Sequence, residues 1–118
     1  PYREDFTEQE LTVLCESLSE AGPQEIVLEY LLANKFGVRV CPHAGGVGLC
    51  EAVRHFAMFD YLAVSGQWDD RVIEYVDNQH EYFVHPTEIV NGRYKAPTAP
   101  GSGVDMKLEA AERYLYKG

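Results

Sequence analysis

The residues best suited to chemistry lie within positions 38–48, which read Val-Arg-Val-Cys-Pro-His-Ala-Gly-Gly-Val-Gly. His43 follows a short apolar run and precedes a glycine-rich turn. In parallel α/β folds, ligands and catalytic groups gather at the carboxyl ends of the strands. Histidine also transfers protons readily near neutral pH. The segment therefore predicts a general acid or base at His43. The structural alternative is a histidine that only hydrogen-bonds a loop carbonyl.

Gly45, Gly46 and Glu74 are further candidates for a ligand site. The glycines lack the spacing and the lysine of a P-loop, and the dinucleotide fingerprint is absent. Anion binding at the amino terminus of the helix that follows them remains open, for a substrate carboxylate as for a phosphate. Glu74 follows a second apolar run and an acidic turn. An exposed or ion-paired glutamate on a helix is its alternative reading.

The other histidines and the cysteines indicate structure rather than chemistry. His55 is expected to be structural, and His80 and His85 are expected at the surface or in turns. Three cysteines at irregular spacings, Cys15, Cys41 and Cys50, predict reduced intracellular thiols rather than a disulfide framework. A zinc site built from Cys41, His43 and Cys50 fits no common ligand spacing. It stays open as one hypothesis.

Alternating helices and short apolar strands must position these side chains. Thr7 and Glu10 form a capping box that predicts a first helix within residues 8–20. The pattern then predicts further helices over 24–35, over 48–59 and from Asp69 to Gln79, and strands over 38–41 and 61–65. This rhythm is typical of a parallel sheet that helices cover on both faces, an α/β fold.

The amino-acid composition changes after Gln79. Residues 81–104 are rich in proline and glycine and predict short extended pieces joined by turns, with an Asn-Gly hairpin turn at residues 91–92. A last short helix is expected within residues 105–117. Two parallel strands are too few for a stable barrel, which takes about 250 residues. We therefore expect the end of a larger fold.

Composition narrows the classes of partner. The formal net charge is −9, and no basic run is longer than one residue. Binding to nucleic acid or to anionic membranes is therefore not expected, because phosphate groups are bound by clustered lysine and arginine. No stretch approaches the roughly 20 apolar residues of a transmembrane helix, and no signal-peptide core opens the chain. A soluble cytoplasmic protein is expected, or a mitochondrial one in a eukaryote.

Residues 41–51, Cys-Pro-His-Ala-Gly-Gly-Val-Gly-Leu-Cys-Glu, resemble L-fuconate dehydratases, which are acid-sugar dehydratases of the enolase superfamily. The likeness includes Lys-Phe-Gly-Val at 35–38, extends through 70–77, and continues to the Gly-Arg-Tyr-Lys-Ala-Pro segment that begins at residue 92. It covers residues 20–118.

The resemblance implies a fold. It is a (β/α)8 barrel with an α+β capping domain, of which this chain would supply the carboxy-terminal part as an incomplete barrel. The expected divisions are a divergent helix or remnant of the sixth strand at 1–19, a barrel segment with strands seven and eight at 20–83, and the return to the capping domain at 84–118. Strand seven would hold Val-Arg-Val-Cys-Pro-His, and strand eight Tyr-Leu-Ala-Val-Ser-Gly.

The resemblance also implies a reaction in carbohydrate acid catabolism. The family removes the proton beside a sugar-acid carboxylate, holds the enediolate on Mg²⁺, and expels water to give a 2-keto-3-deoxy acid. His43 matches the catalytic histidine, Glu74 the acidic residue that bonds the substrate carboxylate, and Glu16 the position of the carboxylate that pairs with the histidine. Gly45 and Gly46 would border the substrate.

The remaining machinery of the family has no counterpart in this chain. The lysine base and the three metal ligands belong to strands two to five, so we expect no turnover without the remainder of the barrel. The alternative is a non-catalytic truncated paralogue or an interaction module.

Overall fold

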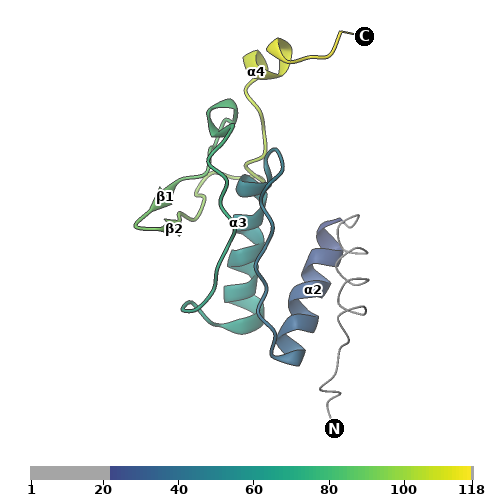
Figure 1. Ribbon diagram of the computed structural model, residues 1–118, viewed down its shortest axis with the longest axis vertical. Helices are drawn as coiled ribbons and strands as arrows, with labels where there is room; N and C mark the ends of the chain where they lie inside the picture. The colour runs from purple at the N-terminus through teal and green to yellow at the C-terminus, as the bar shows by residue number, and fades with distance from the viewer. Residues whose placement is uncertain (1–21, 118) are drawn as a thin grey trace.

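The computed structural model describes residues 22–117 (Figure 1). Its larger elements are helix α2, Pro23–Phe36, and helix α3, Leu49–Phe59, which continues into the π-helical turn η1, Asp60–Ser65. The carboxy-terminal part holds smaller elements: η2, His80–Tyr82; β1, Ile89–Val90; β2, Arg93–Tyr94; and α4, Leu108–Arg113. The helix expected within residues 8–20, which contains Glu16, lies outside the described residues.

Local signals fix the two long helices where the sequence predicted them. Pro23 occupies the start of α2, where its missing N–H costs nothing, and Gly37 ends the helix with a left-handed φ of 68°. Gly48 precedes α3 with a φ of 74°, a conformation that other residues rarely adopt. Its Cα also faces the Phe83 ring, which would lie 3.2 Å from an added Cβ.

The strand predicted over 61–65 is wrong, because these residues form η1 and prolong α3. The Ser65 hydroxyl donates to the Asp60 carbonyl at 3.3 Å, and Gly66 ends the turn with a φ of 63°. A short apolar run without alternation fits a buried strand and a helix equally well. Here the run directly follows a formed helix, and it continues the coil.

The helix predicted from Asp69 to Gln79 is also wrong. Asp70 has a left-handed φ of 65°, and residues 71–77 are extended rather than helical. The Glu74 N–H donates to the Pro42 carbonyl at 3.2 Å, not to a carbonyl one turn earlier in its own segment. The predicted strand at 38–41 lies in the other extended segment, residues 38–43, but it forms no regular ladder.

These two extended segments lie side by side, joined by the bond from Glu74 to Pro42. In Figure 1 they run in the same direction, and α3, which connects them in the chain, runs in the opposite direction. Extended segment, helix and parallel extended segment is the crossover unit of parallel α/β folds. The second extended segment of this crossover unit is therefore residues 71–77, and not the predicted strand over 61–65.

The core lies between α3 and the two extended segments. Ala44, Cys50 and Val53 are its buried members, and the partly buried residues packed against them are Leu49, Ile73, Val76 and Tyr94. Tyr94 comes from β2, so the carboxy-terminal part contributes to the same core. The core is small, and polar contacts supplement it.

A buried carboxylate fastens the carboxy-terminal part to α3. Glu51 is 1% exposed, and its Oε1 accepts hydrogen bonds from His80 Nδ1 at 2.9 Å and from the Thr87 N–H at 3.1 Å. Burial opposes ionisation of Glu51, but the bonds from His80 and Thr87 outweigh it and lower its pKa. His80, expected at the surface or in a turn, begins the turn η2. Its side chain is only 15% exposed, because this contact and one from Nε2 to the Val76 carbonyl cover both ring nitrogens.

The remaining carboxy-terminal elements follow local turn chemistry. Asn91 and Gly92 have φ values of 52° and 72°, as a two-residue hairpin turn between β1 and β2 requires. The predicted hairpin is thereby confirmed, and α4 confirms a short helix within 105–117. Within residues 22–117, none of the helices has the length and apolar character needed to cross a bilayer.

The close contact between Gly103 and Arg54 allows the packing of the carboxy-terminal part against α3 to be tested by mutation. Arg54 is 5% exposed and donates to the Glu51 and His85 carbonyls, and an added Cβ at Gly103 would lie 2.5 Å from its Nη2. We expect Gly103→Ala to lower the free energy of unfolding by roughly 2–4 kcal/mol, from left-handed strain and loss of a buried hydrogen bond. Urea unfolding measures it.

Gly101→Ala is the matched control. Gly101 has a φ of 98° but nothing within 4 Å of an added Cβ, so only the backbone strain applies, about 1–2 kcal/mol. Equal losses in the two variants would contradict the packing of Arg54 against Gly103.

Candidate active site

The structure brings His43 and Glu74 together. His43 Nδ1 lies 2.5 Å from Glu74 Oε2, and the same oxygen accepts the Ala44 N–H at 2.5 Å. The two side chains are 75% and 39% exposed, so the pair faces outward from the core. The sequence predicted both residues, but it placed Glu74 on a helix.

The two residues lie opposite each other on the two extended segments. His43 is the last residue of the first segment, 38–43, and Glu74 lies within the second, 71–77. The Pro42 carbonyl receives the Glu74 N–H, so this bond brings the two side chains together. Glu16, the third predicted catalytic residue, lies outside the described residues.

The surroundings of Glu74 favour its charged form. The hydrogen bond from the Ala44 N–H is the main cause that lowers the pKa of this carboxyl, and partial desolvation works against it. The nearby His43 imidazole lowers the pKa further. Glu74 is therefore a carboxylate at neutral pH and can accept a hydrogen from the imidazole.

The imidazole has one nitrogen engaged and one available. Nδ1 faces Glu74, and no hydrogen bond from Nε2 to a residue of 22–117 is seen. A carboxylate on Nδ1 orients the ring and favours a hydrogen on that nitrogen, which leaves Nε2 to exchange a proton with a substrate. This arrangement suits a general acid or a general base.

The two glycines that were predicted to border a substrate lie differently. An added Cβ at Gly45 would lie 2.7 Å from His43 Cε1, so Gly45 leaves room for the imidazole. An added Cβ at Gly46 would lie 2.8 Å from Leu49 Cδ1, so Gly46 faces the start of α3. Only Gly45 lies against the catalytic candidate.

The described residues do not form a metal centre. Within 22–117, no group of three histidine, cysteine, aspartate or glutamate side chains could hold an ion. Cys41 is exposed, whereas Cys50 is buried and its thiol points to the Ala44 carbonyl at 3.6 Å. The zinc hypothesis for Cys41, His43 and Cys50 is therefore not supported, and these residues do not suit Mg²⁺ either.

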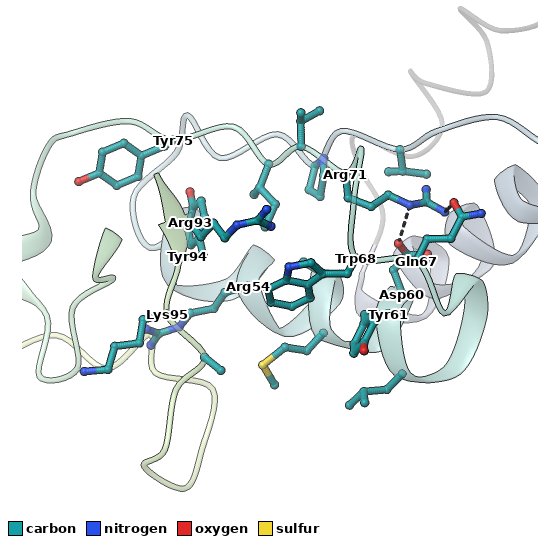
Figure 2. Close-up of a pocket in the computed structure, with 18 of the residues that line it drawn as sticks. Arg54, Asp60, Tyr61, Gln67, Trp68, Arg71, Tyr75, Arg93, Tyr94 and Lys95 are labelled. Atoms are coloured by element: carbon teal, nitrogen blue, oxygen red, sulfur yellow. Dashed lines mark hydrogen bonds and ion pairs between the residues drawn. The ribbon is translucent and has the colours of Figure 1, made fainter. Parts of the chain in front are cut away.

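A pocket lies between α3, the two extended segments and the β1–β2 hairpin. Its volume is about 770 Å³, and Figure 2 shows Trp68 near its middle, with Tyr61, Gln67 and Arg71 toward one end and Tyr75 and Tyr94 toward the other. Arg71 Nε lies 3.5 Å from Asp60 Oδ2. His43 and Glu74 do not line this pocket, so its size alone would have misdirected a search for the site.

Sequence reasoning missed two residues that support the site from outside it. Glu51 is the last residue of the eleven-residue motif, yet nothing local shows that it is buried. Tyr94 donates its hydroxyl to the Glu74 carbonyl at 2.5 Å. The position of Tyr94 two residues after the Asn-Gly turn was the available signal, because such a turn fixes which face each flanking residue takes.

The family of the chain follows from comparison with known proteins. Residues 6–111 match the family described as enolase C-terminal domain-like, so the chain belongs to that family. The fold agrees with it: the chain is part of an enolase-type β/α barrel domain, as the sequence predicted.

The individual relatives are of two kinds. Mitochondrial enolase superfamily member 1 of Xenopus laevis is 51% identical over 86 residues, which are 73% of this chain and 19% of that protein. L-galactonate dehydratase of Hypocrea jecorina is 44% identical over 97 residues, 82% of this chain and 21% of that protein. The crystal structure of human mitochondrial enolase superfamily member 1 superposes on 80% of the chain with a TM-score of 0.77 and 45% identity. The chain covers 22% of that structure, so it spans about a fifth of the length of these relatives.

The pKa of Glu74 gives a direct test of the site. Because its folded pKa is lowered from the ordinary 4.5, the His43–Glu74 contact is complete above that pH and is lost as pH falls through the folded value. In His43→Gln, we expect the pKa to rise only part of the way, because the Ala44 N–H bond remains. Titration of the Glu74 side-chain ¹³C resonance measures both. A full return to 4.5 in this variant would contradict the dominance of the backbone bond.

Gly45→Ala tests the space beside the imidazole. The exposed ring can swing aside, so we expect less than about 1 kcal/mol of lost stability but a raised pKa of Glu74. Thermal unfolding and the same ¹³C titration measure the two effects. Gly22→Ala, whose added Cβ would lie 3.4 Å from Glu25 Oε2, is the control that should leave Glu74 unchanged. An unaltered Glu74 titration in Gly45→Ala would show that the ring does not need this gap.

Proposed function

We propose that this chain supplies the acid of an acid-sugar dehydratase, with His43 as the proton donor and Glu74 as its partner. The observation that carries the proposal is the His43–Glu74 contact between two parallel extended segments that the Glu74–Pro42 hydrogen bond joins. Membership of the enolase C-terminal domain-like family and the likeness to an L-galactonate dehydratase support it.

The proposed step is loss of a β-hydroxyl group. After a base removes the proton beside the carboxylate, the electron pair of that C–H bond forms a C=C bond as the C–O bond at the β carbon breaks. The leaving oxygen departs as water only when a proton reaches it. His43 delivers that proton from Nε2, and Glu74 stabilises the charged ring beforehand through Nδ1. The enol then rearranges to a 2-keto-3-deoxy acid.

The resemblance places the remaining machinery on barrel strands two to five, which have no counterpart in this chain. The resemblance assigns the base to a lysine and the enediolate to Mg²⁺, and the side chains of 22–117 form no site for that ion. No step here is therefore assigned to a metal. We propose that residues 20–83 act as the barrel segment and 84–118 as the return to the capping domain, within a complete barrel.

The proposed substrate class is a six-carbon sugar acid, with L-fuconate as the first choice. L-Fuconate and L-galactonate differ only at carbon 6, where a methyl group replaces a hydroxymethyl group. Both share the carboxylate, the acidic α proton and the β-hydroxyl that the reaction needs. Each is therefore a suitable probe, and their relative kcat/KM reports the preference at carbon 6.

A chimera tests the proposal without requiring the chain to act alone. The 97-residue matching region of the Hypocrea jecorina L-galactonate dehydratase would be replaced by the aligned residues of this chain. We expect the chimera to release a 2-keto-3-deoxy acid from L-galactonate, L-fuconate or both. In that background, His43→Asn should lower kcat roughly 10²–10⁴-fold, the usual contribution of general acid–base catalysis.

His55→Asn is the matched control. Among residues 22–117, His55 bonds the Ser102 carbonyl and not Glu74 or His43, and its replacement should leave kcat within about twofold. Unchanged turnover in His43→Asn would refute the assigned role. A folded chimera that turns over neither acid would favour the alternative of a non-catalytic interaction module.

A further inference from the structure

The Glu74 backbone is held on both sides by other parts of the chain. Its N–H donates to the Pro42 carbonyl at 3.2 Å, and its carbonyl accepts the Tyr94 hydroxyl at 2.5 Å. Its carboxylate meets His43 and the Ala44 N–H. Residues 71–77 have no regular helix or ladder of their own, so these few bonds determine where Glu74 lies.

Packing fixes the Tyr94 hydroxyl in place. The ring packs against the buried Ala44, Cys50 and Val53. Its edge meets the Tyr75 ring at 5.9 Å, and Tyr75 stacks on His80 at 5.4 Å with an interplanar angle of 3°. Figure 2 shows Tyr75 and Tyr94 at the same end of the pocket. Burial raises the pKa of Tyr94, so the hydroxyl keeps its proton and remains a donor.

The hairpin turn decides that this hydroxyl faces Glu74. Tyr94 pairs with Ile89 across the two-residue turn, and Lys95 N–H donates to the Glu88 carbonyl beyond it. A shift of one residue in this register would turn the Tyr94 side chain to the other face. The carboxy-terminal part therefore reaches the site through one side chain.

We propose that Tyr94 is a positioning residue, which holds the Glu74 backbone so that the Glu74 carboxylate reaches His43. This inference rests on the proposed function and deepens it, because it assigns control of the acid's partner to the 84–118 segment. Tyr94 touches neither the imidazole nor the carboxylate, and it acts only through the Glu74 carbonyl. Its hydroxyl, rather than its ring, carries the effect.

Tyr94→Phe in the 118-residue chain removes the hydroxyl and keeps the ring. We expect the pKa of Glu74 to rise toward its ordinary value, because the carboxylate is no longer held against the Ala44 N–H and the imidazole. The His43 ¹⁵N spectrum should also lose its preference for a hydrogen on Nδ1. Side-chain ¹³C and ¹⁵N titrations measure these changes directly and need no turnover.

Tyr82→Phe is the matched control. Its hydroxyl bonds the Tyr114 hydroxyl at 2.9 Å in the same carboxy-terminal part, away from Glu74. It should lose one tyrosine hydroxyl hydrogen bond, here an exposed one, while leaving the Glu74 pKa and the His43 tautomer as in the unmodified chain. A loss of general stability alone would affect both variants, whereas positioning affects only Tyr94→Phe.

Two results would overturn the inference. One is a folded Tyr94→Phe chain with unchanged Glu74 and His43 titrations. The other applies if that variant fails to fold, and it is measured on the unmodified chain. There the Tyr94 hydroxyl proton should exchange slowly and show a nuclear Overhauser effect to residue 74 or 75. Rapid exchange of this proton would exclude the hydrogen bond. Inactive chimeras with a shifted Glu74 in Tyr94→Phe would refute the proposed function and leave the positioning role intact.

Discussion

One backbone hydrogen bond, from the Glu74 N–H to the Pro42 carbonyl, sets the geometry on which the rest of the site depends. It joins two extended segments beside His43 and Glu74, so that these two side chains meet. A parallel pair cannot be closed by a tight turn, so the chain between must travel back along a helix. Helix α3 makes that return, and its apolar face also supplies the buried residues that hold both segments in place.

Polar contacts, in addition to the small hydrophobic core, hold the carboxy-terminal part against α3. Glu51 accepts from His80 and from the Thr87 N–H, and Arg54 beside it donates to the His85 carbonyl. A buried carboxylate is tolerated only when hydrogen bonds replace its lost hydration. The partners all come from the segment after Gln79, so ionisation of Glu51 and docking of the carboxy-terminal part stabilise each other. The candidate site depends on the same contacts between α3 and the carboxy-terminal part, because Tyr94 of the docked hairpin bonds Glu74.

The errors in the predicted elements share one physical cause. The Tyr61–Ser65 run and residues 71–77 are both short, and the apolar residues within each fit a helix and a strand equally well. What decides them is the neighbour: the first run continues an existing helix, whereas the second finds the Pro42 carbonyl beside it. Exchanging the two predictions moves Glu74 from a helix to an extended segment, where it lies beside His43.

The sequence by itself determined the elements that local chemistry controls. Pro23, Gly37 and Gly48 bound the two long helices, and Asn91-Gly92 makes the hairpin, because each requires only the backbone angles of a few adjacent residues. It also singled out His43, through its place between an apolar run and a glycine turn. Only the tertiary structure decided that Glu74 meets His43, that Glu51 is buried and that Tyr94 holds Glu74. These contacts join residues far apart in the chain, and their partners become neighbours only after α3 has brought the second extended segment back beside the first.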